Sequence, residues 1–141
     1  MVGALVALVG SVTIWTVVDA GAMGEDRYPG RDGDGVIALI TALVAAGLYV
    51  GAMVTRKAVL HAVGGVFSLI TLVVAVLNLA DPERLAKQVA KDESGASDKM
   101  IEQALKTVDV SSGPGIYITL AGALMALVFG VIGFMKARAA R

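Results

Sequence analysis

Four long apolar stretches divide this chain, and almost all of its charged residues lie between or after them. The stretches run over residues 2–18, 36–54, 58–80 and 116–135. A helix rises about 1.5 Å per residue, so about 20 residues cross the roughly 30 Å hydrocarbon layer of a membrane. The last three stretches have that length, whereas the first is shorter and spans only if the bilayer thins locally. The pattern therefore predicts four membrane-spanning segments.

The spans are expected to be α-helices, because backbone N–H and C=O groups have no water to bond with in hydrocarbon. A membrane β-barrel needs short segments of alternating polarity, which these continuous apolar runs exclude. A soluble protein would need further surface to cover four such helices, and 141 residues do not supply it. The predicted fold class is therefore all-α: an integral membrane four-helix bundle that forms one domain over residues 1–141.

Composition agrees with this interpretation and narrows the possible chemistry. Hydrophobic residues make up 57% of the chain, and soluble domains contain about 45–50% even when glycine is included. The chain has no cysteine, which excludes disulfides, thiolate metal sites and cysteine redox chemistry. Its formal charge is zero, so no basic face for nucleic acid is expected. No acidic residue lies within a span, and we predict no enzymatic activity, no metal site and no cofactor.

The charges of the connecting segments set the expected orientation. The short turn over residues 55–57 and the tail over 136–141 carry only bases, whereas the loops over 19–35 and 81–115 carry more acids than bases. Lys and Arg beside short loops favour the cytoplasmic side of a membrane. We therefore predict a multi-pass protein of the cell inner (plasma) membrane, with both termini cytoplasmic and both larger loops extracytoplasmic.

The first 22 residues allow a second interpretation, a cleaved signal peptide. Ala20-Gly21-Ala22 has the small-x-small pattern of a cleavage site. The absence of a positively charged segment at the start, and Asp19 beside the site, argue against cleavage. If cleavage occurred, three spans and an outside N-terminus would remain.

The loop over 81–115 is predicted to contain a short helical hairpin between the third and fourth spans. Asp81 and Pro82 suit the cap and the first position of one helix, and Ser97 suits the cap of a second helix. An apolar face is expected on that second helix, because three residues there recur at helical spacing: Met100, Ile101 and Leu105. Such a face packs on its own bundle, lies in the lipid interface or meets a partner.

Small residues recur at helical spacing in the second and fourth spans. Gly47 and Gly51 form a GxxxG pair, and Gly122, Ala126 and Gly130 form a similar stripe. Small residues let helices approach closely in lipid, where hydrophobic burial gives little attraction between them. Two uses of these positions remain open: packing within the bundle, or contact with another chain.

Three further residues have specific expected places. Asp34 immediately precedes the second span and suits the N-cap position. His61, the single histidine, lies near the basic end of the third span and acts either as an interfacial hydrogen-bonding residue or as a proton relay. Trp15 lies near the outer membrane boundary, as aromatic-belt residues do.

Two short motifs resemble those of a known group of proteins. Asp32-Gly33-Asp34-Gly35 opens the second span, and Gly113-Pro114-Gly115-Ile116-Tyr117 opens the fourth. In both motifs the sequence resembles small four-helix membrane proteins of actinobacteria and related bacteria. The order of a short and then a long loop is also similar to that of tetraspanins, although the long loop lacks their Cys-Cys-Gly motif. The resemblance implies a bacterial four-span layout and no specific activity.

The expected function is that of a structural or accessory integral membrane protein, which packs into a larger membrane complex or a homo-oligomer. Its expected partners are the lipid bilayer and other membrane protein subunits or its own copies, and not nucleic acid. The alternative is a small transporter or channel that acts as an oligomer. Its pore would use the hydroxyl residues of the spans, which could equally bond to their own helix backbones: Ser11, Thr13, Thr16, Thr41, Ser68 and Thr71.

Overall fold

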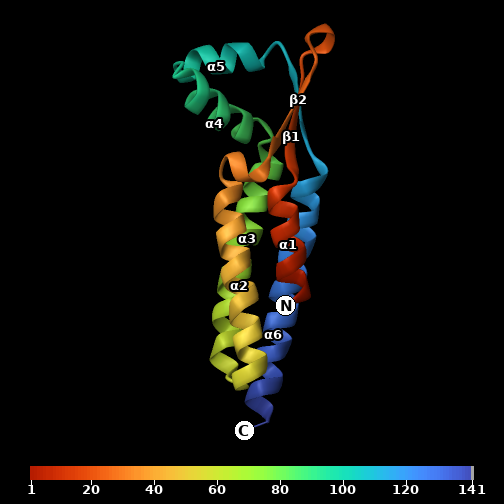
Figure 1. Ribbon diagram of the computed structural model, residues 1–141, viewed down its shortest axis with the longest axis vertical. Coiled ribbons are helices and arrows are strands. Elements are labelled where there is room, and N and C mark those ends of the chain that lie inside the picture. The colour runs from red at the N-terminus through yellow and green to blue at the C-terminus, as the bar shows by residue number, and fades with distance from the viewer. Residues whose placement is uncertain (141) are drawn as a thin grey trace.

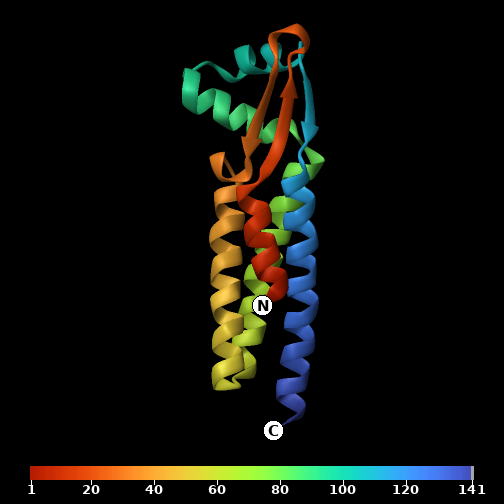
Figure 2. The ribbon, with the colours of Figure 1, turned by 45° about the vertical axis from the view of Figure 1, so that its right-hand side comes forward.

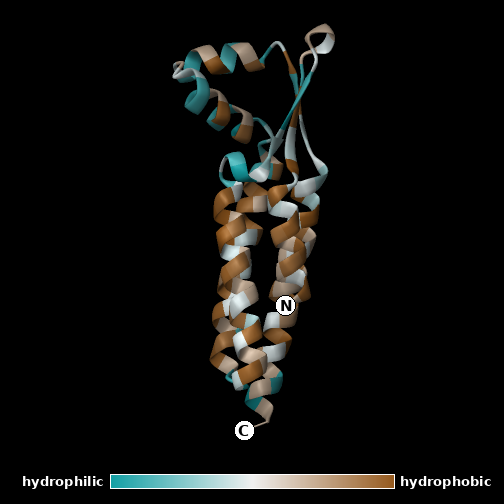
Figure 3. Ribbon diagram, in the orientation of Figure 1, coloured by the Kyte–Doolittle hydropathy of each residue, from teal (hydrophilic) through white to brown (hydrophobic). Residues whose placement is uncertain are grey.

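Long helices carry a smaller head at one end of the molecule (Figure 1). The computed structural model describes residues 1–140. Its long helices are α2 (Gly35–Thr55), α3 (Ala58–Ala80) and α6 (Pro114–Ala139). Each is long and apolar enough to cross a membrane. Apolar residues cover these helices, whereas polar residues gather in the head (Figure 3). Three such helices indicate a membrane protein.

The first apolar stretch is not one continuous helix. Helix α1 covers Val2–Val12, and the chain then continues as strand β1 (Ile14–Asp19). A helix of 11 residues is about 16 Å long, roughly half of the hydrocarbon layer. The prediction of a spanning helix over 2–18 is therefore wrong, and three helices within residues 1–140 have spanning length. The run Ile-Trp-Thr-Val-Val is rich in strand-forming residues, which average hydropathy does not distinguish from helix formers.

Helix α1 nevertheless packs closely against the other helices. It lies along α6 and also contacts α2, while α3 packs against both α2 and α6. Met1 lies beside the middle of α6 and not at either end of it (Figures 1 and 2). The α1–α6 contact brings the two backbones together, because a Cβ added to Gly3 would lie 2.7 Å from the Gly122 carbonyl oxygen. A Cβ on Gly10 would lie 2.9 Å from that of Gly115, so glycines set this close approach.

A three-stranded antiparallel sheet continues from α1 into the head. Strands β2 (Glu25–Pro29) and β3 (Asp109–Ser112) pair with the two sides of β1, in the order β2-β1-β3. Val18 in the central strand is opposite Asp26 on one side and Val110 on the other. The sheet was not predicted, and it joins the segment that follows α1 to the segment that precedes α6.

Two short 3-10 turns complete the segment before α2. The turn η1 (Gly21–Met23) forms the tip of the β1–β2 hairpin, where Gly21 and Gly24 have positive φ angles that other L-residues rarely adopt. The turn η2 (Gly30–Asp32) leads from β2 into α2. This segment therefore returns the chain to the bundle beside the end of α1, where the Gly30 N–H donates to the Thr13 carbonyl oxygen at 3.0 Å.

Two short helices, α4 (Glu83–Ser94) and α5 (Asp98–Leu105), occupy most of the segment between α3 and α6. They meet at Gly95, which ends α4 with a φ of 61°, and together they stand off to one side of the head (Figure 1). We call α4, α5 and their connection the arm. Ser97 occupies the N-cap position of α5, and Pro82 that of α4, although neither side chain makes a capping hydrogen bond.

Trp15 fills the junction between the head and the bundle. Its side chain is 1% exposed, and its Nε1–H donates to the Gly10 carbonyl oxygen at 3.0 Å. The indole is enclosed by protein, so its expected place in a lipid-facing aromatic belt is wrong. Four helices contribute buried side chains to the same cluster: Ala38, Ala75, Leu85, Val89 and Ile116. Since Leu85 and Val89 belong to α4, this cluster also fixes the base of the arm.

Candidate functional site

Hydroxyl groups in the long helices make local and interhelical hydrogen bonds. The Oγ1 atoms of Thr41 on α2 and Thr71 on α3 lie 2.7 Å apart, which joins these helices. Thr16 lies in β1 and donates to the Pro82 carbonyl oxygen at 3.3 Å. Five of the six candidate pore hydroxyls can donate to a carbonyl oxygen three or four residues earlier: Ser11, Thr13, Thr41, Ser68 and Thr71. These contacts favour helix packing over a pore lining.

Tyr49 links α2 to both neighbouring long helices. Its hydroxyl donates to the Ala126 carbonyl oxygen on α6 at 2.8 Å and lies 3.2 Å from Ser68 Oγ on α3. Its ring passes between two glycines: a Cβ on Gly64 would lie 2.9 Å from the ring, and a Cβ on Gly130 would lie 2.5 Å from the hydroxyl. Both glycines are therefore required for the tyrosine to reach across the bundle.

His61 on α3 lies nearer than Tyr49 to the end of the bundle that carries Arg56 and Lys57. The two ring centroids are 6.1 Å apart, and a Cβ added to Gly133 would lie 2.8 Å from the imidazole. His61 Nδ1 is buried and has no hydrogen-bond partner within the described residues, 1–140. The imidazole thus fills a space that glycine leaves on α6, at the basic end of the bundle.

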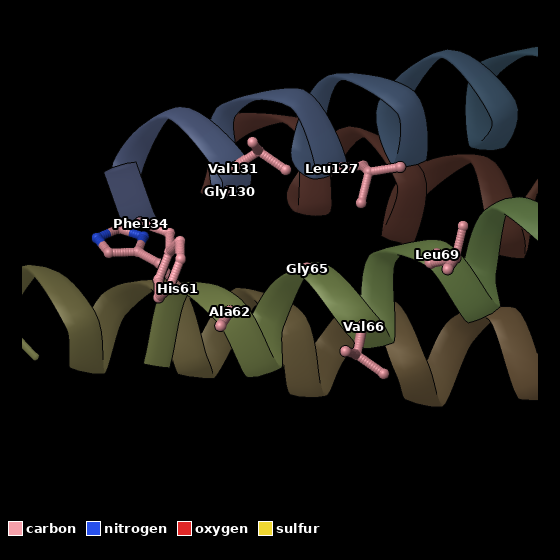
Figure 4. A pocket seen from close by; sticks show the side chains of 9 residues that line it. All are labelled: His61, Ala62, Gly65, Val66, Leu69, Leu127, Gly130, Val131 and Phe134. Carbon is pink, nitrogen blue, oxygen red and sulfur yellow. The ribbon is translucent and has the colours of Figure 1, made fainter. Parts of the chain in front are cut away.

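A cavity of about 260 Å³ opens between α3 and α6 next to His61 (Figure 4). One side is formed by α3 and the other by α6, and Figure 4 shows His61 and Phe134 together at one end of it. The lining is almost entirely apolar and consists of His61, Ala62, Gly65, Val66, Leu69, Leu127, Gly130, Val131 and Phe134. Such a lining suits a hydrocarbon chain better than a polar substrate.

The basic end of the bundle contains a second, larger hollow of about 600 Å³. His61 and Gly133 belong to its lining, as do Arg56 from the end of α2 and Lys136 from the end of α6. Arg138 lies nearby over the Phe134 ring, with its guanidinium carbon 5.5 Å from the ring centroid. Since His61 lines both spaces, the apolar cavity and the basic hollow are neighbours.

The predicted small-residue positions divide into two groups. Gly122, Ala126 and Gly130 face the interior, where they contact α1 or Tyr49. Gly47 faces outward, since a Cβ added there would meet nothing within 4 Å, and Gly51 would reach only Leu60 at 3.5 Å. The stripe on α6 therefore serves packing within the chain, whereas Gly47 leaves a bare position on the surface of α2.

The predicted apolar face of α5 is only partly covered. Ile101 is buried, with 6% of its surface exposed, and Leu105 is half-buried. Met100 on the same helix is 63% exposed. Packing against α4 therefore uses Ile101 and leaves Met100 on the outer side of the arm.

Asp34 ties the shorter loop to the arm. Its carboxylate accepts a hydrogen bond from Arg84 Nε at 2.5 Å and another from Gln88 Nε2 at 2.8 Å, both on α4. Gln88 Oε1 in turn accepts from the Asp34 backbone N–H at 3.0 Å. Asp34 does occupy the N-cap position of α2, but its side chain makes no capping bond there. The expected cap is instead a bridge between segments 50 or more residues apart.

The pKa of Asp34 lies below its ordinary value. Partial burial by itself raises this pKa, but the hydrogen bonds from Gln88 and Arg84, together with the Arg84 charge, outweigh that effect. Folding therefore favours the ionised carboxylate. Its contribution to stability is complete above the pKa of the unfolded chain and is lost as the pH falls through the folded-state pKa.

Replacing Asp34 by asparagine is expected to lower the free energy of unfolding by about 1–2 kcal/mol at neutral pH, because a half-exposed charged hydrogen-bond pair is lost. The difference from the wild type should shrink below about pH 4, where the carboxylate of the unfolded chain also takes up a proton. Denaturant titrations in detergent at several pH values measure this. Asp92→Asn, at an exposed position on α4, is the control, and equal effects of both variants would contradict the bridge.

Reasoning from the sequence missed three structural contacts. Trp15 was placed at a lipid boundary, Tyr49 received no role, and the pairing of Asp34 with Arg84 was not foreseen. A local signal exists for Tyr49, since a tyrosine within an apolar span requires a hydrogen-bond partner. The Asp34–Arg84 pairing depends on how the two loops meet, and no local pattern in the sequence encodes it.

Among residues 1–140, no group of three or more His, Cys, Asp or Glu side chains is arranged to hold a metal ion. Comparison with protein families, with curated proteins and with solved structures found no match to this chain. The arrangement of its own residues is therefore what supports a function.

Proposed function

We propose that this chain is a non-enzymatic accessory membrane protein, which attaches to a larger membrane complex or to its own copies. The observation that carries this proposal is the arm, a helical pair that is held firmly at its base and exposes an apolar side chain at its far helix. The long helices provide the membrane anchor, and the arm provides the contact surface.

The base of the arm is fixed by two independent sets of contacts. Leu85 and Val89 are buried in the cluster around Trp15, and Asp34 holds Arg84 and Gln88 from the other side. A surface held in this way loses little conformational freedom when a partner binds, which favours association. These contacts hold α4, and α5 packs against α4 in turn.

The far helix of the arm offers a suitable contact. Met100 is 63% exposed and lies on α5 among charged and polar neighbours, including Lys99 and Glu102. Methionine adapts its shape to an apolar partner, and a polar rim around an apolar centre is common in protein interfaces. Gly47, which is bare on the outer side of α2, offers a second position where another helix could approach.

The proposed location is a bacterial inner membrane, with the head on its extracytoplasmic side. The α2–α3 turn and the end of α6 lie at the same end of the bundle (Figure 1), and both carry basic residues, namely Arg56, Lys57, Lys136 and Arg138. The positive-inside rule assigns that end to the cytoplasm. The positive-inside rule therefore places the C-terminal end of α6 in the cytoplasm. It does not place Met1, which lies beside the middle of α6.

Purification of the full chain in a mild detergent, followed by mass spectrometry, tests this proposal. We expect a stable complex with another subunit or with further copies of the chain, and we expect Met100→Glu to lose most of it. Met23→Glu is the matched control, because Met23 is even more exposed, at 93%, but lies at the tip of the β1–β2 hairpin. A wild type that purifies as a lone monomer would argue strongly against an accessory role.

A further inference from the structure

We propose that the groove between α3 and α6 binds one anionic phospholipid, whose acyl chain fills the apolar cavity and whose headgroup lies in the basic hollow. This inference is independent of the partner that the arm contacts. The bound phospholipid belongs to the leaflet at the basic end of the bundle.

The cavity has the chemistry of an acyl-chain site. Its lining is apolar apart from His61, and its floor is open at Gly65, where a Cβ would find its nearest neighbour, Leu127 Cδ1, 4.0 Å away. The cavity lies between two helices that both have spanning length, so its opening faces the hydrocarbon. An acyl chain brings no polar group of its own that would be left unpaired against such a surface.

The neighbouring hollow has the charge that selects the headgroup. Arg56 and Lys136 line it, and Arg138 lies close by over Phe134, which itself lines the cavity. The segments over 35–80 and 114–140, which form all three long helices, contain no acidic residue. These bases are therefore not neutralised by carboxylates of the surrounding helices. Basic pockets between membrane helices bind anionic headgroups through this charge complementarity.

The two spaces are joined in the order that a phospholipid requires. His61 lines both of them, and Figure 4 shows it at one end of the cavity with Phe134, while Leu69 and Leu127 lie toward the other end. The apolar part thus points toward the middle of the bundle, and the basic part lies at its end. A free phosphate would leave the apolar cavity empty, whereas a phospholipid fills both spaces.

The test uses the full chain in nanodiscs of equimolar phosphatidylglycerol and phosphatidylcholine with identical acyl chains, followed by mild extraction and native mass spectrometry. We expect the wild type to retain one lipid, predominantly phosphatidylglycerol. Gly65→Leu, which fills the cavity, should lose retained lipid of both classes. Gly47→Leu is the matched control, because it adds the same side chain at an open surface position.

A second pair of variants tests the headgroup and does not depend on how Gly65→Leu folds. Arg56→Gln and Lys136→Gln should each lower the preference for phosphatidylglycerol by about fivefold. Lys57→Gln, at a basic residue that does not line the hollow, should leave the preference unchanged. Equal retention of both lipids by the wild type, or full retention by Gly65→Leu, would overturn the proposal. A dimer that occupies the groove without lipid would also overturn it.

Discussion

Replacement of Trp15 by alanine is expected to lower the free energy of unfolding by about 3–5 kcal/mol, the usual cost of removing a large buried aromatic side chain. The indole is 1% exposed and belongs to a cluster with buried side chains from four helices. Its loss leaves a cavity at the point where the sheet, the arm and the long helices meet. The effect should therefore reach the head before it reaches the bundle.

Two measurements separate these effects. Denaturant unfolding in detergent gives the overall loss. Limited trypsin digestion reports local unfolding of the arm, because cleavage after Lys87 or Lys91 requires α4 to unwind. Met23→Ala is the control, because that side chain is 93% exposed and its removal should cost less than about 0.5 kcal/mol. If Trp15→Ala were as stable as this control, the indole would not be the junction described above.

The second large effect is expected at Gly122, where even a single methyl group does not fit. A Cβ there would meet the backbone nitrogen of Ala7 and the carbonyl oxygen of Gly3, and helix backbone cannot move aside as a flexible side chain can. Gly122→Ala should therefore push α1 away from α6 and lower the free energy of unfolding by about 2–3 kcal/mol, near the upper end for overpacked sites.

Gly47 provides a control with the opposite expected sign. A Cβ at Gly47 meets nothing within 4 Å, and alanine is favoured over glycine in a helix by about 0.5–1 kcal/mol. Gly47→Ala should therefore be neutral or slightly stabilising in the same unfolding assay. If the two alanine variants behaved alike, the close α1–α6 contact would be wrong.

The sequence was sufficient to locate the three long helices, because each is a charge-free apolar run of spanning length, apart from the ends. It did not locate the end of α1. The run from Val2 to Val18 is uniformly apolar, and the change from helix to strand at Ile14 depends on pairing with β2 and β3. Strand pairing between distant segments is a tertiary property that local hydropathy does not contain.

The candidate sites show the same division between local and tertiary information. The small-residue stripe through Gly122 and Gly130 was recognised as a packing surface, but its partners, Gly3 and Tyr49, follow only from the arrangement of the helices. The apolar cavity beside His61 could not be foreseen, because it is a space between α3 and α6. Asp34 was assigned to a local cap, and the structure instead shows a hydrogen bond from Gln88 on α4.

The proposed role depends above all on the arm contacting a partner while the protein is in its native membrane. A photo-crosslinking amino acid at Met100 of the full chain, activated in intact membranes, tests this most directly, with the same substitution at Met23 as the control. We predict a covalent product with one other polypeptide, or with a second copy, from position 100 and none from position 23. No product from position 100, or equal products from both positions, would contradict the proposal.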